Sequence, residues 1–111
     1  MNPPTSQAAY LDIAIGALIE ARRRKKKLTQ EKLAAKVGIS QPRLSRIEAG
    51  KSAISLRELR TLEAVFGKEI EADAEEIVEL ARRGAGAMSS RAETQIAASE
   101  LIPIVAKRWN R

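Results

Sequence analysis

The 111-residue sequence contains no cysteine and no histidine. Without thiols and imidazoles, the chain cannot form disulfides, metal sites built on Cys and His, or the common nucleophilic and acid–base catalytic pairs. Most classes of enzyme are therefore excluded. We expect no catalytic residue, no metal site and no cofactor.

Aromatic residues and long apolar runs are also scarce. Tyr10, Phe66 and Trp109 are the only rings, so we expect a core of aliphatic side chains, for which a hydrophobic content of 44% is sufficient. No run approaches the roughly 18 apolar residues of a membrane span, and the first residues lack the basic start of a signal peptide. These features predict a cytoplasmic protein that does not contact a membrane.

Charge is unevenly distributed along the chain. Lys and Arg number 20 against 14 Asp and Glu, which gives a formal charge of +6. Residues 1–68 hold 14 basic and 6 acidic residues, whereas residues 69–111 hold 6 and 8. Positive charge favours a polyanionic partner, while the six acidic residues between 69 and 79 would repel one. We therefore expect nucleic acid to contact the first 68 residues.

Helical periodicity dominates the pattern of apolar residues. Apolar side chains recur three and four positions apart in segments 9–26, 30–37, 41–49 and 56–66, and the last of these stripes includes Leu56. Two further helices are predicted, one opened by Asp73 and ended by Gly84, the other following Ser90. No alternation of period two indicates a strand. The sequence therefore predicts an all-α protein.

Helix-capping residues mark where several of these helices begin and end. Thr29 and Ser40 are expected N-caps, and Ser55 with a glutamate three positions later forms a capping box. Gly38 is expected to end the second helix with a positive φ. Two short helices separated by a tight turn require a small residue where they cross, and Ala34 meets that need.

Residues 28–51 resemble the helix-turn-helix of the phage Cro/repressor-type regulators, also called the xenobiotic-response-element group, and the resemblance extends over residues 13–67. It implies a five-helix repressor-like domain whose third helix enters the major groove of double-stranded DNA. We divide the chain into a flexible arm (1–8), this DNA-binding domain (9–67) and a helical extension (68–111) for dimerisation or partner binding.

The resemblance also implies which residues contact DNA. Expected base contacts are made by Gln41, Pro42, Arg43 and Arg46. Expected phosphate contacts are made by Thr29, Gln30, Ser40, Ser45, Lys51, Arg24 and Lys27.

Three further positions can be compared with the family pattern. Arg23 and Glu48 occupy positions that often pair between the first and third helices. Lys27 stands where the family has glycine, which predicts either a strained positive φ or a longer first helix.

The resulting hypothesis is a DNA-binding transcriptional repressor that binds a palindromic operator as a homodimer. One alternative is an antitoxin or anti-activator, whose helix-turn-helix regulates its own operon while residues 88–111 bind a partner protein. Another is an adaptor that kept the fold and uses the third helix for protein contacts. Binding to double-stranded DNA separates the first two from the third.

Overall fold

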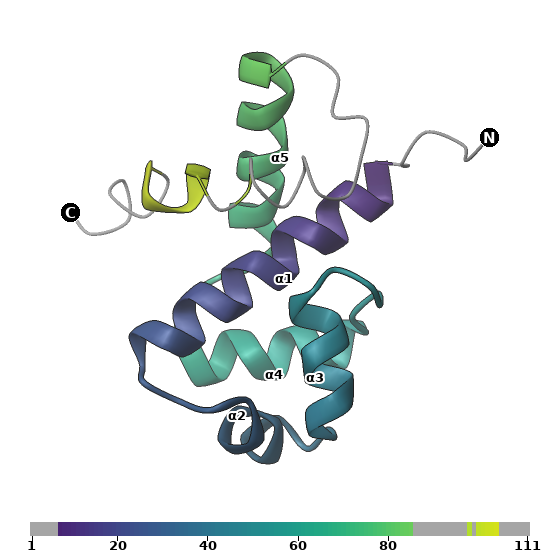
Figure 1. Cartoon of the computed structure of the whole chain (residues 1–111), viewed down its shortest axis with the longest axis vertical. Coiled ribbons are helices and arrows are strands. Elements are labelled where there is room, and N and C mark those ends of the chain that lie inside the picture. Colours follow the sequence, from purple (N-terminus) through teal and green to yellow (C-terminus); the bar gives the residue numbers. More distant parts are fainter. Residues whose placement is uncertain (1–6, 86–97, 99, 105–111) are drawn as a thin grey trace.

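The fold is entirely helical in the part of the chain that the structure describes. The computed structural model describes residues 7–85, 98 and 100–104 (Figure 1). Its helices are α1 (Gln7–Lys25), α2 (Gln30–Val37), α3 (Gln41–Glu48), α4 (Leu56–Phe66) and α5 (Glu71–Ala85). Residues 100–104 are also helical, and none of the described residues forms a strand. The predicted all-α class is therefore confirmed, and no helix among these residues is long and apolar enough to cross a membrane.

Helix α1 lies between the other helices. It packs against α3 on one side and against α5 on the other, so that in Figure 1 α2, α3 and α4 lie below it and α5 rises above it. The contact with α3 is very close at Gly16, where a Cβ atom would lie 2.2 Å from the carbonyl oxygen of Ile47. Only glycine leaves room for this approach of two backbones.

The core is built from aliphatic side chains, as expected. Its largest fully buried members come from the five helices and from the connection before α5, and are Ile13, Leu18, Ile19, Leu33, Leu44, Ile47, Leu62, Ile70 and Ile77. Ala98 is also buried, and Leu101 and Ile102 pack partly against this cluster. The helical residues near the C-terminus therefore contribute to the same core as the helix-turn-helix.

The prediction that Leu56 belongs to the apolar stripe of α4 is wrong, because the residue is 62% exposed. Leu59, Leu62 and Phe66 form the buried face of this helix. At about 100° per residue, Leu56 lies roughly a quarter turn away from that face. A spacing of three from Leu59 was therefore not enough to bring Leu56 into the core.

The helix ends agree with the capping residues except at α5. Thr29, Ser40 and Ser55 are the N-caps of α2, α3 and α4, and the capping box between Ser55 and Glu58 is complete. Gly38 has a φ of 83°, as the predicted turn requires. Lys27 has a φ of 57°, so the first helix ends before it and the strained conformation predicted for this position is present.

Helix α5 begins two residues before the predicted N-cap. Asp73 lies inside its first turn and forms an ion pair with Arg22 of α1 at 2.6 Å. The backbone N–H of Ile70, just before α5, instead donates a hydrogen bond to the Glu63 carboxylate of α4 at 2.7 Å. A side chain from the preceding helix thus caps α5 in place of a local capping box, and α5 continues past Gly84 to Ala85. The helix predicted after Ser90 begins outside the described residues.

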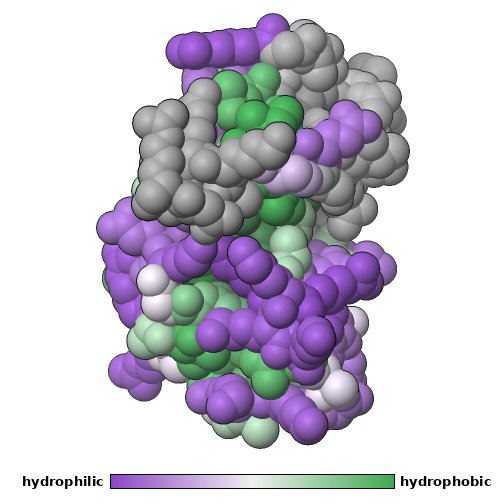
Figure 2. Space-filling model, turned by 90° about the vertical axis from the view of Figure 1, so that its left-hand side faces the viewer, coloured by the Kyte–Doolittle hydropathy of each residue, from purple (hydrophilic) through white to green (hydrophobic). Residues whose placement is uncertain are grey.

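Hydrophilic residues surround a small apolar patch on the side of the molecule turned away from α3. Figure 2 views this side and shows the patch in green in the lower half. A shallow groove of about 260 Å³ lies between the end of α1, α2 and α4, and is lined by Lys26, Leu28, Lys36 and Val65.

Candidate nucleic-acid interface

Helices α2 and α3 form two short rods joined by a tight turn. Leu33 and Ala34 of α2 and Leu44 and Ile47 of α3 are buried in one small core, as the sequence predicted. Burial of these residues leaves the opposite side of α3 exposed to solvent. The helix-turn-helix therefore presents one face of α3 outward, held on a packed base.

Two predicted base contacts are freely accessible on this face. Pro42 and Arg46 are exposed and lie four positions apart, so they are neighbours on the same side of α3. Within the described residues, the Arg46 guanidinium forms no ion pair or side-chain hydrogen bond. It therefore retains all its donors for a ligand.

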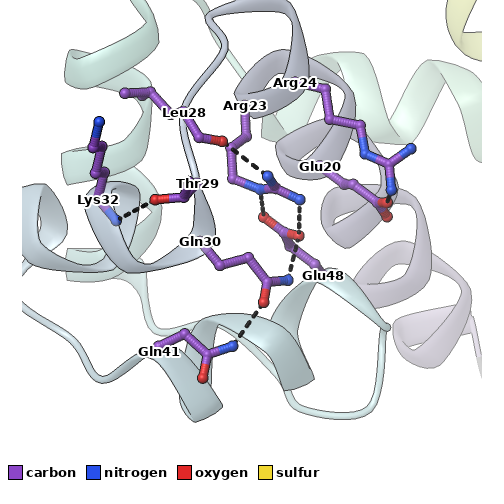
Figure 3. Close-up of polar contacts among 9 residues, drawn as sticks. All are labelled: Glu20, Arg23, Arg24, Leu28, Thr29, Gln30, Lys32, Gln41 and Glu48. Atoms are coloured by element: carbon purple, nitrogen blue, oxygen red, sulfur yellow. Dashed lines mark hydrogen bonds and ion pairs between the residues drawn. The ribbon is translucent and has the colours of Figure 1, made fainter.

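A chain of polar side chains connects α1 to the first residue of α3 (Figure 3). Arg23 donates to Glu48 through Nε at 2.8 Å and through Nη2 at 3.1 Å. Glu48 also accepts from Gln30 Nε2 at 2.9 Å, and Gln30 Oε1 accepts from Gln41 Nε2 at 2.7 Å. The expected pairing of Arg23 with Glu48 is thus present and extends to two of the predicted DNA contacts.

Burial strengthens the hydrogen bonds among these four side chains. The Glu48 side chain is only 3% exposed and that of Arg23 is 12% exposed, so water screens their attraction weakly. The hydrogen bond to Glu48 raises the pKa of Arg23, and a third donor, Nη1, is bound by the Leu28 carbonyl at 2.9 Å. The amides of Gln30 and Gln41 are consequently held in one orientation. Gln41 retains its carbonyl oxygen and one N–H for another partner.

Arg43 is engaged in a second ion pair, with Glu58 of α4. Its Nε and Nη2 atoms each donate to one carboxylate oxygen at 2.7 Å, and Nη2 also donates to the Ala53 carbonyl at 3.2 Å. The hydrogen bond from Arg43 lowers the pKa of Glu58 to about 2, helped by the Ser55 N–H, which donates to the same carboxylate at 2.8 Å. A contact between Arg43 and a base stays a prediction.

Apart from Ser45 within α3, the predicted phosphate contacts lie at or next to the ends of α1, α2 and α3. Thr29 and Ser40 are exposed, and their hydroxyl oxygens accept from the backbone N–H groups of Lys32 and Arg43. Lys51 is exposed beyond α3, whereas Ser45 is half-buried.

Two further cations predicted to contact phosphate lie at the end of α1. Arg24 pairs with Glu20 at 2.7 Å, and Lys27 is exposed in the turn that follows. The structure therefore gathers most of the predicted contacts near α3 and places these two cations at the end of α1.

Sequence reasoning missed two residues that shape this region. Glu58 was recognised as part of a capping box, but its pairing with a residue 15 positions earlier leaves no local pattern. Gly16 was overlooked because a single glycine within a helical pattern does not indicate which backbone approaches it. The described residues hold no group of acidic side chains that could bind a metal ion.

The packed base, the exposed face of α3 and the surrounding cations define a helix-turn-helix DNA-binding unit. Comparison with known families agrees: residues 19–72 match the family model described as helix-turn-helix, which spans the end of α1 and all of α2, α3 and α4. No curated protein and no solved structure matched the chain. Residues 19–72 therefore form a helix-turn-helix domain, the domain of a DNA-binding transcriptional regulator.

Proposed function

We propose that the protein is a transcriptional repressor that binds a palindromic operator as a homodimer, with α3 in the major groove. The observation that carries this proposal is the outward face of α3. There Arg46 has unused donors, while Gln41 is held by a hydrogen bond from its amide. Arginine and glutamine are the side chains that form paired hydrogen bonds with guanine and adenine, respectively.

Each side chain on this face has a distinct role in the proposal. Arg46 and Gln41 read base edges, and Pro42 supplies an apolar contact such as one with a thymine methyl group. Gln30, Lys51 and the N-termini of α2 and α3 contact phosphates, since free backbone N–H groups at a helix start favour anions.

A dimer follows from the geometry of operator recognition. One α3 covers only a few base pairs, and two-fold operators are matched by two-fold proteins whose half-sites lie about one helical turn apart. The hypothesis of a protein partner bound through residues 88–111 concerns a segment of which only residues 98 and 100–104 are described. No contact of these residues favours the antitoxin or anti-activator over the repressor.

The test is fluorescence anisotropy with duplex DNA from upstream of the protein's own gene and a scrambled duplex, at two salt concentrations. A repressor of its own gene binds the first duplex roughly 10³-fold more tightly, with a steep salt dependence. Analytical ultracentrifugation of the complex gives its stoichiometry, for which we expect two chains per duplex. Equal weak binding to both duplexes would contradict the proposal.

A variant of Arg46 tests whether α3 determines the preference for the operator sequence. Arg46→Ala should reduce the discrimination between the two duplexes by about 1–3 kcal/mol, because it removes a base contact. Arg83→Ala is the matched control, since it removes the same charge from an exposed position on α5. An unchanged ratio of affinities in the Arg46 variant would show that another residue reads the operator.

A further inference from the structure

The ion pair between Arg43 and Glu58 uses a specific part of the arginine. Guanidinium groups carry five N–H donors. Nε and one N–H of Nη2 are bound by the two carboxylate oxygens, and the second N–H of Nη2 is directed to the Ala53 carbonyl. Nη1 has no hydrogen-bond partner among the described residues. The arginine therefore retains one nitrogen with two donors, at a position fixed by three bonds.

The location of Nη1 distinguishes Arg43 from an arginine that reads a base. Arg43 lies one turn before Arg46 on α3, at the edge of the exposed face, where its side chain reaches the 49–55 connection and α4. Bidentate recognition of guanine needs two neighbouring nitrogens, and the Nε–Nη2 edge is already occupied. A single free nitrogen with two donors instead suits an oxygen-rich anion such as a DNA phosphate.

We propose that Glu58 is a positioning residue, which holds Arg43 so that its Nη1 contacts a phosphate of the operator rather than a base. This inference rests on the proposed DNA-binding function and assigns a new role to a residue of α4. Glu58 binds both the Ser55 N–H and the guanidinium, so one carboxylate caps α4 and fixes the arginine. The pKa of about 2 means that this pair is ionised at every pH used for binding assays.

The proposal predicts a change in DNA affinity opposite to the change that charge alone would cause. Glu58→Gln removes a negative charge close to α3, which alone would strengthen binding to a polyanion. If Glu58 positions Arg43, the same variant weakens binding, because a glutamine amide has one acceptor oxygen in place of two and its NH2 group would face a guanidinium N–H. Glutamine remains a good residue for a capping box, so α4 should keep its start.

The test measures affinity and its salt dependence for the full-length protein. The probes are the duplex selected by the wild-type protein from a random-sequence pool and a scrambled duplex. Glu58→Gln and Arg43→Lys should each weaken binding to both duplexes by roughly fivefold and reduce the slope of log affinity against log salt by about 0.9, while the ratio of the two affinities stays constant. Circular dichroism at the assay temperature establishes that each variant is folded.

Two controls separate positioning from charge and from stability. Asp73→Asn makes the same change of charge in an ion pair of similar length, 2.6 Å, between α1 and α5, and it should not weaken binding. In an Arg43→Ala background, Glu58→Gln should no longer weaken binding, because the residue acts through Arg43.

Each outcome decides between the hypotheses. Binding of the Glu58 variant that is as tight as that of the wild type, or weakened equally in the Arg43→Ala background, overturns the inference. A change in the ratio of affinities would instead assign Arg43 to a base. Failure of the wild-type protein to select any duplex overturns the proposed function and this inference with it, a result distinct from an effect confined to the variants.

Discussion

Replacement of Glu48 by alanine should be among the most damaging single changes in this fold. The carboxylate accepts two hydrogen bonds from Arg23 and one from Gln30, and its side chain is 3% exposed. Removal of one member of a buried ion pair costs about 3–5 kcal/mol, since the other charge remains buried without compensation. Arg23 keeps its bond to the Leu28 carbonyl, so we expect the lower end of this range.

A loss of about 3 kcal/mol is large for a domain of this size. Domains of 60–100 residues shift in Tm by about 4–8 °C for each kcal/mol, which predicts a decrease of about 12–24 °C. Thermal and urea denaturation followed by circular dichroism measure this change. Glu48→Gln keeps the volume and one acceptor oxygen, so its effect should be about half as large.

The matched control is Glu79→Ala, which breaks an ion pair with Arg83 in which both side chains are more than half exposed. Exposed pairs contribute about 0–1 kcal/mol, so this variant should unfold close to the wild-type temperature. A Glu48 variant as stable as the Glu79 variant would refute the view that the buried ion pair between Arg23 and Glu48 holds α1 and α3 together.

Three other variants test separate features of the fold. Gly16→Ala should destabilise the domain by about 2–3 kcal/mol in urea titrations, because a Cβ atom 2.2 Å from the Ile47 oxygen forces α1 and α3 apart. Lys27→Gly should stabilise it by about 0.5–1 kcal/mol by relieving the positive φ, and should reduce the salt slope of DNA binding by about 1 if Lys27 contacts a phosphate. The ion pair of Glu58 contributes stability that is complete above its usual pKa of 4.5 and is lost as the pH falls towards about 2. Urea titrations at pH 6 and pH 3 should therefore show Glu58→Gln and the wild type becoming more similar at the lower pH, and a constant difference would contradict this assignment.

The features that could be predicted from the sequence are those fixed by neighbouring residues. A threonine or serine cap acts on an N–H three positions away, and a glycine turn needs only its own φ, so the limits of α2, α3 and α4 followed from local pattern. The start of α5 did not, because the group that caps it, Glu63, lies seven positions earlier on another helix. A local capping box at Asp73 was available in the sequence, but the tertiary contact with Arg22 used that side chain instead.

The candidate site also has features that local sequence predicts and features that depend on contacts between helices. The outward position of Pro42 and Arg46 follows from the burial of Leu44 and Ile47 on the opposite side of a short helix, which periodicity alone predicts. The bonds of Gln30 and Arg43 do not follow, because each joins residues on different helices. Such contacts depend on how the helices cross, which a single sequence does not specify.

Among the described residues, α1 separates a cluster of acidic side chains from the cations around α3. The six acidic residues between 69 and 79 lie just before α5 and along its first nine residues, on the far side of α1 from α3. The bonds from Arg22 to Asp73 and to the Glu69 carbonyl tie this segment to α1. The electric field of a polyanion exerts a torque on such a charge distribution, which turns its positive side toward the polyanion during approach. If α3 enters the major groove as proposed, more of the diffusional encounters begin with α3 facing the double helix, so the acidic side chains promote association from the opposite side of α1.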